Sequence, residues 1–345
     1  MAKNVLNKSL RAAKATKQDE FYTQLSDIEK ELRHYTRHFK GKIVLCNCDD
    51  PRVSNFFHFF SYNFEKLGLK KLIATCYKNQ NPDLFSKNDS QKAIFLEYTG
   101  NKKGSNVPNL DETDIKYLRG DGDFRSSECI ELLKRADIVV TNPPFSLFRE
   151  YISQLVTMEK KFLVIGNLNA ISYKEIFRFI KGNKVWLGYE HPVAFAVPDH
   201  YEMRTVRSWR DENGTNWRSL GNACWFTNLD IAKRHEDLIL YKEYRPKDNP
   251  KYDNYDAIEV SKYADIPSDY TGIMGVPVTF LEHHNPKQFE ILGITDRANT
   301  SGLRTKKYTV KEVPNFNDLN ARSVIRTGNN YKAIYARLLI KQKSQ

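Results

Sequence analysis

The residues best suited to carry chemistry are the four at positions 142–145, Asn-Pro-Pro-Phe. The side-chain oxygen of Asn142 is a hydrogen-bond acceptor, and the peptide oxygen of Pro143 is a second one. The rings of Pro143 and Pro144 fix two backbone φ angles, so the turn between these acceptors is rigid. Two converging acceptors can bind both hydrogens of an exocyclic amine and direct its lone pair at an electrophile. Phe145 offers a flat face on which a heteroaromatic ring could stack.

A short apolar run, Ile-Val-Val at 138–140, comes directly before this turn. Its β-branched residues predict a buried strand, and open α/β sheets bind ligands at the carboxyl ends of their strands. In this position the turn resembles the catalytic motif of S-adenosylmethionine-dependent amino-methyltransferases, (Asp/Asn/Ser)-Pro-Pro-(Tyr/Phe/Trp). The alternative is a simple turn with an aromatic ring packed beneath it. The preceding strand and the further matches below favour the functional interpretation.

A second chemical turn follows residues 42–47 (KIVLCN), which read as a strand, and precedes an aromatic-rich helix expected at 53–60. The carboxylates of Asp49 and Asp50 could bind the amino group or the ribose of a cofactor. Alternatively, Asp50 caps the helix with Pro51 at its first position, and both roles are compatible. No Gly-x-Gly fingerprint is present here, which fits S-adenosylmethionine better than a dinucleotide.

A third turn, GDGDFRS at 120–126, precedes a helix expected at 127–135. Asp121 or Asp123 could accept a hydrogen bond from an adenine amine while Phe124 stacks on the ring. The acidic residues could equally be a simple N-cap of the helix. The sequence leaves the two interpretations open.

Strands and helices alternate through about residue 182, which predicts an α/β fold with a parallel sheet and crossover helices. Two further strands of this sheet are expected at 185–188 and 224–227. An insertion at 79–119 carries a hairpin that pairs 93–98 with 115–118. Later strands are expected at 273–281 and 335–341.

The charge of the chain points to a polyanionic partner, nucleic acid first, because 345 residues carry a net charge of +12. Residues 1–18 contain five basic residues, Lys14 and Lys17 among them, and no acid. Residues 303–345 contain ten Lys or Arg and two acids. Between 200 and 218, Arg204, Arg207 and Arg210 alternate with aromatic residues such as Trp209, which favours DNA contact over a surface hairpin turning at 212–214.

Together these segments resemble the EcoRI-type adenine-specific DNA methyltransferases. The resemblance is carried by FYT (21–23), CNCDDPRVSNFF (46–57), GDGDFRSSE (120–128), DIVVTNPPFSLF (137–148) and MGVPVTFL (274–281). It implies a Rossmann-like class I fold with an appended or inserted target-recognition region. It also implies that the target adenine is flipped out of duplex DNA. The implied cofactor is S-adenosylmethionine, without a metal, and its implied contacts are Phe21, Tyr22, Thr23, Asn47, Asp49, Asp50, Pro51, Asp121, Asp123 and Phe124.

The strand at 71–77 ends in Cys-Tyr, where most such enzymes carry the acid that binds the ribose, so Asp49 or Asp50 is expected to take that role. We expect a basic arm at 1–18, a catalytic domain at 19–235 with a DNA-contacting loop at 190–220, and target recognition at 236–345. The expected activity is N6-methylation of adenine, with GAATTC as the first candidate site. This methylation would protect the DNA from a cognate restriction endonuclease. Methylation of an RNA adenine or a protein glutamine is the alternative.

The chain has no apolar run of about 18 residues and no apolar segment near its start. Its five Cys are an odd number and show no spacing typical of a disulfide framework. We therefore expect a cytoplasmic protein without a membrane segment. It is expected to act as a monomer and to need no obligate protein partner.

Overall fold

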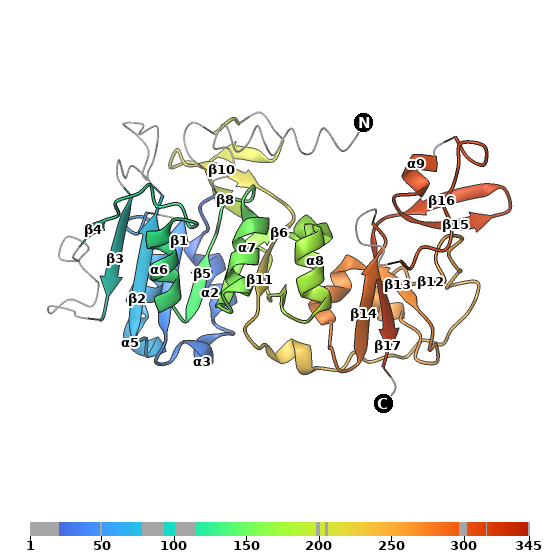
Figure 1. Cartoon of the computed structure of the whole chain (residues 1–345), viewed down its shortest axis with the longest axis horizontal. Coiled ribbons are helices and arrows are strands. Elements are labelled where there is room, and N and C mark those ends of the chain that lie inside the picture. Colours follow the sequence, from blue (N-terminus) through green and yellow to red (C-terminus); the bar gives the residue numbers. More distant parts are fainter. Residues whose placement is uncertain are drawn as a thin grey trace. The chain divides into compact units, whose positions relative to one another are not determined.

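The computed structural model describes residues 21–48, 50–77, 93–100, 115–197, 201–203, 206–296, 302–314 and 316–343. The chain forms two compact units (Figure 1). The first comprises Met1–Ala170 and Leu187–Leu229, and the second comprises Ile171–Trp186 and Asp230–Gln345. The second unit therefore begins close to the limit expected at 235/236, but it also includes the segment Ile171–Trp186, which the sequence assigned to the catalytic domain.

An eight-stranded sheet forms the centre of the first unit, in the order β4-β3-β2-β1-β5-β6-β11-β7. Its four central strands are parallel: β2 (Lys71–Cys76), β1 (Ile43–Cys48), β5 (Ile138–Thr141) and β6 (Lys161–Asn167). From β1 the chain continues to β2 on one side and later to β5 on the other. The carboxyl ends of β1 and β5 are therefore neighbours at the point where the strand order reverses, which is where doubly wound sheets bind ligands.

The outer strands make the sheet mixed rather than parallel. β3 (Ile94–Tyr98) and β4 (Lys116–Tyr117) are antiparallel on one side, and β11 (Ala223–Thr227) is antiparallel to β6 on the other, beside β7 (Trp186–Leu187). The α/β fold of the class I methyltransferase type and the hairpin of 93–98 with 115–118 are confirmed. The sequence analysis left the directions of the strands at 185–188 and 224–227 open, because strand direction depends on long connections that have no local signature, and β11 proves antiparallel to β6.

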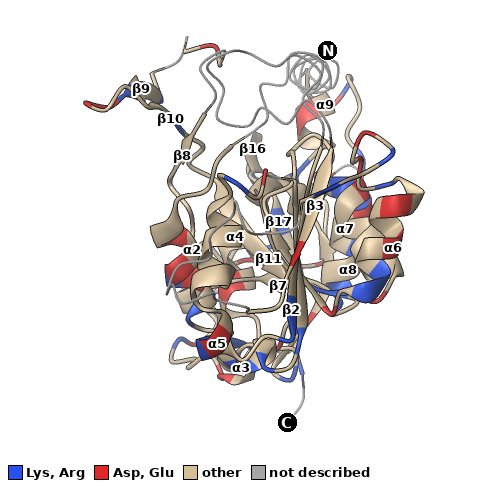
Figure 2. Cartoon of the chain, turned by 90° about the vertical axis from the view of Figure 1, so that its left-hand side faces the viewer, with Lys and Arg blue, Asp and Glu red and all other residues tan. Residues whose placement is uncertain are grey.

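Helices cover both faces of this sheet (Figure 2). α2 (Leu25–Leu32) and α4 (Asn55–Tyr62) lie on one face, α6 (Ser127–Arg135) and α7 (Phe148–Thr157) on the other, and α3 (Thr36–Phe39) and α5 (Phe64–Leu67) are short. Ser54 caps α4 by accepting from the Phe57 N–H, and Ser126 caps α6 by accepting from the Cys129 N–H. The capping roles considered for Asp50 and for the acids at 121 and 123 are therefore wrong.

A small three-stranded sheet of the first unit, in the order β8-β10-β9, stands beyond the carboxyl edge of the large sheet (Figure 1). It consists of β8 (Ala194–Ala196), β9 (Ser208–Arg210) and β10 (Asn216–Ser219). The carboxylate of Asp211 accepts from the N–H groups of Asn213 and Thr215 and so forms the turn of the β9–β10 hairpin. This confirms a hairpin at 212–214.

The second unit contains a four-stranded sheet in the order β12-β13-β17-β14. Its elements are α8 (Lys174–Lys181), β12 (Ile258–Glu259), β13 (Met274–Pro277), β14 (Phe289–Ile294), α9 (Phe316–Leu319) and β17 (Arg337–Gln342), with a separate hairpin of β15 (Ser323–Thr327) and β16 (Asn330–Ile334). The strand expected at 273–281 is shorter, because after Pro277 the chain turns into the 3₁₀ segment Val278–His283. No helix within the described ranges is both long and apolar enough to cross a membrane.

Candidate active site

The side chain of Asn142 connects the turn after β5 to the Phe-Tyr-Thr segment at 21–23. Its amide nitrogen Nδ2 donates to the main-chain oxygen of Phe21 at 2.6 Å and to Oγ1 of Thr23 at 3.3 Å. Asn142 is 6% exposed, and its oxygen Oδ1 is buried without a hydrogen-bond partner. Buried polar atoms almost always have partners, so an acceptor left unpaired beside two satisfied donor bonds points to a ligand. This geometry leaves Asn142 Oδ1 available for the acceptor role that the sequence predicts.

The peptide oxygens of the turn also differ in whether they accept a hydrogen bond. Those of Pro144 and Phe145 accept from the N–H groups of Leu147 and Phe148, which lead into α7. No described N–H or hydroxyl group donates to the oxygen of Pro143. Two acceptors next to each other in the chain are thus available to one amine.

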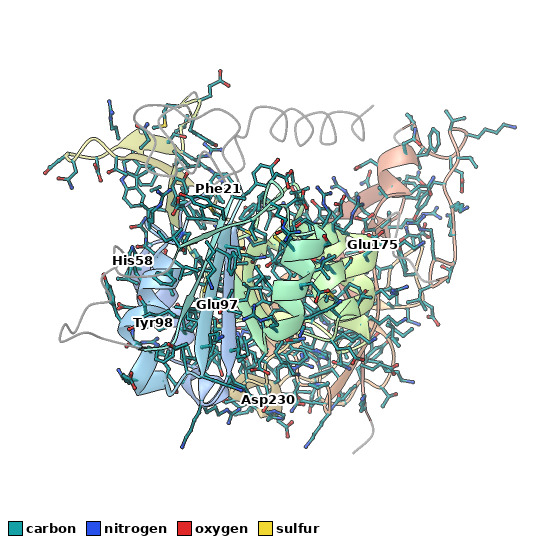
Figure 3. All side chains as sticks on the ribbon, turned by 60° about the vertical axis from the view of Figure 1, so that its left-hand side comes forward. Phe21, His58, Glu97, Tyr98, Glu175 and Asp230 are labelled. Carbon is teal, nitrogen blue, oxygen red and sulfur yellow. The ribbon has the colours of Figure 1, made fainter. Side chains whose placement is uncertain are left out.

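Aromatic rings surround this turn. The ring of Phe21 lies 5.3 Å from that of Phe145, 5.8 Å from that of Phe195 and 6.1 Å from that of Tyr201. Phe145 is half-buried, so part of its ring can accept a stacked partner. In Figure 3, Phe21 and Tyr98 lie at opposite ends of the large sheet. Tyr98 is the last residue of the antiparallel strand β3, so it marks the amino edge of the parallel strands and Phe21 lies at their carboxyl edge. The three residues at 21–23 and the turn at 142–145 are therefore close together at the carboxyl edge.

The end of β1 is held against β5 and α7 through Asn47. Its main-chain oxygen accepts from the hydroxyl of Thr141, and its Oδ1 accepts from the hydroxyl of Tyr151 at 2.5 Å. Burial raises the pKa of Tyr151 well above its usual value, so this phenol remains a donor. Only the amide NH₂ of Asn47 is left for a further partner.

Asp50 is tied to Arg52 in the same turn. The carboxylate is 2% exposed, accepts from the Arg52 main-chain N–H at 2.9 Å and forms an ion pair with the Arg52 guanidinium. Pro51 is also buried. The negative charge of Asp50 is therefore compensated from within the turn, which the sequence did not predict.

The loop at 120–126 packs on the end of β2. Gly122 has a φ of +79°, and an added Cβ would lie 2.3 Å from the main-chain oxygen of Cys76. Oδ1 of Asp121 accepts from the Asp123 N–H, and the Asp123 carboxylate pairs with Arg125 at 2.6 Å. The ring of Phe124 lies 5.1 Å from that of Tyr151. The loop thus stands beside the β1 turn.

The predicted DNA-contacting residues that the structure describes lie on the β9–β10 hairpin. Arg207 and Arg210 are exposed, and Nε of Arg210 donates to the main-chain oxygen of Gly214. Trp209 is 44% exposed, and its ring is parallel to that of Trp217 at 6.3 Å. Asp49, Lys14, Lys17 and Arg204 lie outside the described residues.

The small sheet that contains this hairpin is connected to the segment at 21–23 by a bridge that the sequence did not predict. Tyr22 pairs with Ala196 of β8: the Tyr22 N–H donates to the Ala196 oxygen at 2.8 Å, and the Ala196 N–H donates back at 3.1 Å. Phe195 and Tyr201 were also missed as neighbours of the site. An isolated bridge between distant residues has no sequence signature, although aromatic residues close to the Arg-rich segment were visible.

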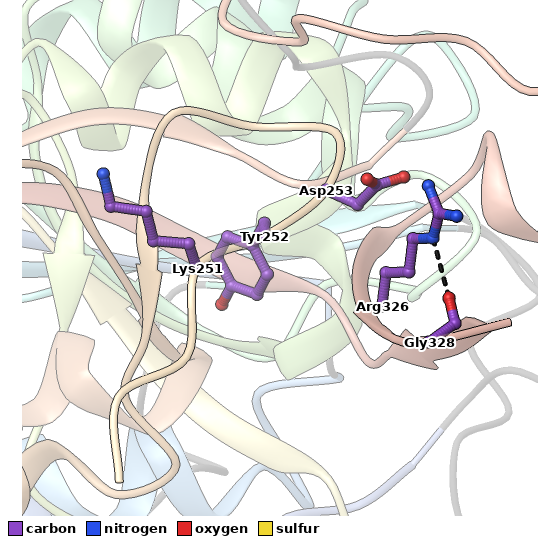
Figure 4. A pocket seen from close by; sticks show the side chains of 5 residues that line it. All are labelled: Lys251, Tyr252, Asp253, Arg326 and Gly328. Atoms are coloured by element: carbon purple, nitrogen blue, oxygen red, sulfur yellow. Dashed lines mark hydrogen bonds between the residues drawn. The ribbon is translucent and has the colours of Figure 1, made fainter. Parts of the chain in front are cut away.

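A pocket of about 480 Å³ lies within the second unit and is lined by Lys251, Tyr252, Asp253, Arg326 and Gly328 (Figure 4). Two of its polar side chains are already paired: Asp253 with Lys306 and Tyr308, and Arg326 with the Gly328 oxygen. No group of three or more potential metal ligands occurs among the described residues. The turn at Asn142 is therefore the better candidate for chemistry.

Comparisons with known proteins identify the family and relatives of this chain. The family model described as adenine-specific methyltransferase EcoRI matches residues 9–343. Type II methyltransferase M.EcoRI of Escherichia coli is 52% identical over 297 residues, covering 85% of this chain and 90% of the relative. Type II methyltransferase M.MgeORF184P of Mycoplasma genitalium is 39% identical over 341 residues, covering 96% and 98%. Type II methyltransferase M.MpnI of Mycoplasma pneumoniae is 38% identical over 304 residues, covering 86% and 89%.

No solved structure matches the chain. The family model nevertheless spans nearly all of it, including the Asn-Pro-Pro-Phe turn, the Phe-Tyr-Thr segment and the loops at the ends of β1 and β2. The chain belongs to the EcoRI family of adenine-specific methyltransferases.

Proposed function

We propose that this protein transfers a methyl group from S-adenosylmethionine to N6 of an adenine flipped out of duplex DNA. The observation that carries the proposal is the buried, unpartnered Oδ1 of Asn142. An adenine amine has two hydrogens, and Asn142 Oδ1 and the Pro143 oxygen are two neighbouring acceptors for them. Holding both hydrogens orients the nitrogen lone pair, so much of the rate acceleration comes from positioning rather than from a strong base.

The relatives support DNA as the substrate, since all three are named Type II methyltransferases. An adenine within a duplex cannot place N6 in an enclosed turn, so it must leave the base stack. Phe145 provides the stacking face, and the exposed basic residues of the β9–β10 hairpin, Arg207 and Arg210, are proposed to contact DNA together with Trp209, Lys14, Lys17 and Arg204. The part of the second unit from residue 236 to 345 is the proposed target-recognition region. GAATTC is the first candidate recognition sequence.

The residues at the carboxyl edge fit a cofactor without phosphate groups. S-adenosylmethionine supplies an electrophilic methyl group when bound. Asn47 offers its amide NH₂, and Oδ2 of Asp121 has no hydrogen bond within the described residues, so the two offer a donor and an acceptor. We propose that Phe21, Tyr22, Thr23, Asn47, Asp49, Asp50, Pro51, Asp121, Asp123 and Phe124 form this site. Within it, Asp50 acts by shaping the turn through its pair with Arg52.

The test is transfer of a labelled methyl group to duplex DNA with and without GAATTC, using wild type and Asn142→Ala. We expect label on adenine N6, and a fall in kcat of roughly 100-fold or more in the variant. Asn63→Ala is a matched control, because the Asn63 amide also donates to a main-chain oxygen, that of Phe59, but lies at the end of α4. This control should retain wild-type activity.

Each outcome bears on a different part of the proposal. Label on DNA that lacks GAATTC would keep the chemistry and reject that recognition sequence. Label on RNA or protein but never on DNA would reject DNA as the substrate and favour an RNA adenine or a protein glutamine. The protein is further proposed to act as a monomer in the cytoplasm, and size measurement of the enzyme with and without DNA tests the monomer.

A further inference from the structure

Arg218 of β10 has a fixed place on one face of the small sheet. In the strand register it lies opposite Phe195 of β8 and Ser208 of β9. Directly opposed residues of antiparallel strands have their side chains on the same face. Nη1 of Arg218 accordingly donates to Oγ of Ser208 at 3.3 Å.

The same face leads to the Asn142 turn. Because Tyr22 pairs with Ala196, the flanking residues Phe21 and Thr23 have their side chains on the face of Phe195. The 5.8 Å contact of the Phe21 and Phe195 rings agrees with this. Asn142 then contacts Thr23 from this side. Arg218 and the segment at 21–23 are separated by β8 alone, which is two strand spacings or about 10 Å.

The charge of Arg218 is not compensated within the described part of the chain. Its side chain is half-buried, its one hydrogen bond is to the neutral Ser208, and its Nε is buried without a partner. Arg125 and Arg337, in contrast, pair with the carboxylates of Asp123 and Glu259. A guanidinium that is partly desolvated without an anion is costly, so its retention suggests a ligand with negative charge.

We propose that Arg218 binds a phosphate of the DNA strand that carries the target adenine, while Asn142 holds the base of that nucleotide. The inference rests on the proposed function and adds a positioning residue to it. Phosphate is the anion that every nucleotide supplies, and the planar guanidinium matches its oxygens. The distance between the amine of an adenine and its own phosphate is of the same order as two strand spacings. Arg218 thus holds the flipped nucleotide at its phosphate, while Asn142 holds it at its base.

A phosphate contact has a signature that a purely structural arginine lacks. Its loss should weaken binding to DNA that carries the target adenine and reduce the dependence of log Kd on log salt for that DNA by about one ion. Since the contact orients the flipped nucleotide, KM for DNA should rise more than kcat falls. The dissociation constant of S-adenosylmethionine should not change.

The decisive experiment combines a variant with a chemical change in DNA. The methylated adenine is first located in the duplex that the wild type modifies. Duplexes are then made with one uncharged methylphosphonate linkage immediately 5′ or 3′ of that adenine, and kcat/KM is measured for wild type and Arg218→Gln. We expect that one of the linkages costs wild type about tenfold or more, that Arg218→Gln costs a similar factor on natural DNA, and that the two losses do not multiply.

Two controls keep the result interpretable. Lys66→Gln also removes one positive charge, but from α5, which leads into the amino end of β2, and it should stay as sensitive to the methylphosphonate as wild type. Arg218→Lys keeps a point charge without the fork and should recover part of the activity. If Arg218→Gln does not fold, as judged by circular dichroism, Arg218→Lys takes its place in the cycle.

The outcomes separate the two proposals. Losses that multiply at both linkages would overturn the role of Arg218 and leave adenine methylation intact. An unchanged salt dependence together with a weaker affinity for S-adenosylmethionine would mark Arg218 as structural and would also overturn it. A wild-type enzyme that methylates no DNA would reject the proposed function itself, and with it this inference.

Discussion

At the scale of single residues, Asn142 is required to do two things with one amide group. Its nitrogen anchors the side chain to the Phe21 oxygen and Thr23 Oγ1, and this orientation leaves its oxygen for the substrate. A carboxylate, which has two acceptors and no donor, would fill the same space but could not donate to the Phe21 oxygen. The sequence motif alone accepts Asp in place of Asn, whereas the contact with the Phe21 carbonyl favours Asn in this chain.

Asn142→Asp should therefore reduce activity strongly at neutral pH, although the motif tolerates Asp. The carboxylate would meet the Phe21 oxygen without a hydrogen, at a cost of about 1–3 kcal/mol, which corresponds to a fall in kcat of roughly 5- to 150-fold. Steady-state kinetics with duplex DNA measures this. Wild-type kcat in Asn142→Asp would show that the Nδ2 contact is dispensable.

The same variant should become more active, relative to wild type, as the pH falls. Burial and the nearby carbonyl raise the pKa of an introduced carboxyl group, and the protonated form regains a donor for the Phe21 oxygen. The ratio of kcat values, variant to wild type, should rise from about pH 8 to about pH 6. A ratio that is flat over this range would contradict the argument.

The sequence predicted these residues one at a time but not their contacts. The Asn-Pro-Pro-Phe turn was identified by its acceptors and its prolines, and Phe-Tyr-Thr through the family resemblance. The hydrogen bond between Asn142 and Phe21 joins positions 121 residues apart, and only the folded sheet brings them together. Similarly, the acids at 50 and 123 were expected to be available, but each has an arginine two residues later that pairs with it.

At the scale of elements, the site depends on the turns that follow β1 and β5 and on the loop at 120–126, which follows β4 and packs on the end of β2. Most strands and helices were predictable because apolar runs alternate with amphipathic stretches. The bridge from Tyr22 to β8 was not, since pairing of single residues in distant segments depends on the final packing. That bridge brings the small sheet next to the Asn142 turn.

Gly122 is the position where one loop most closely approaches the sheet. Gly122→Ala would add a Cβ that meets the Cys76 oxygen at 2.3 Å and the Ala93 Cβ at 2.9 Å, at a φ of +79°. We expect the loop to shift, with a cost of roughly 1–3 kcal/mol and a dissociation constant for S-adenosylmethionine raised about tenfold or more. Calorimetric titration of the cofactor measures this shift.

Gly120→Ala is the matched control in the same loop. Its added Cβ would lie 3.6 Å from a Glu128 carboxylate oxygen, an ordinary contact, and the Gly120 N–H that donates to Glu128 is kept. Cofactor affinity in this variant should stay near that of wild type. Equal losses in the two variants would mean that the loop tolerates no added carbon anywhere, and the specific role of Gly122 would be lost.

At the scale of the whole molecule, the proposed chemistry and the acid-sensitive His284 described below belong to different units. The first unit gathers the proposed chemistry at one edge of its sheet, and the second buries polar groups in its core, such as Glu259 paired with Arg337. The sequence shows that predicted strands and helices no longer alternate after residue 240. The four-stranded sheet there was not, because its neighbours β13, β17 and β14 come from distant parts of the chain.

His284 makes the stability of the second unit sensitive to acid. The ring is 4% exposed, and its Nε2 lies 3.1 Å from the Phe289 oxygen, to which it donates. Burial lowers its pKa from 6.5 to about 4, and the charges of Arg234 and Lys343 act in the same direction. Because the pKa is depressed in the folded state, the stabilisation is fully present above the unfolded pKa and is lost as the pH falls toward 4.

We therefore expect the free energy of unfolding of the second unit to decrease by about 2 kcal/mol through His284 between pH 7 and pH 5. His284→Gln keeps a donor for the Phe289 oxygen but cannot take up a proton. The stability difference between wild type and this variant should move in favour of the variant by that amount over this range. Urea unfolding at the two pH values, followed by hydrogen exchange of the β14 and β17 amides, measures the change. A difference that does not vary with pH would mean that His284 does not titrate in this way, and that the acid sensitivity of the unit comes from its carboxylates.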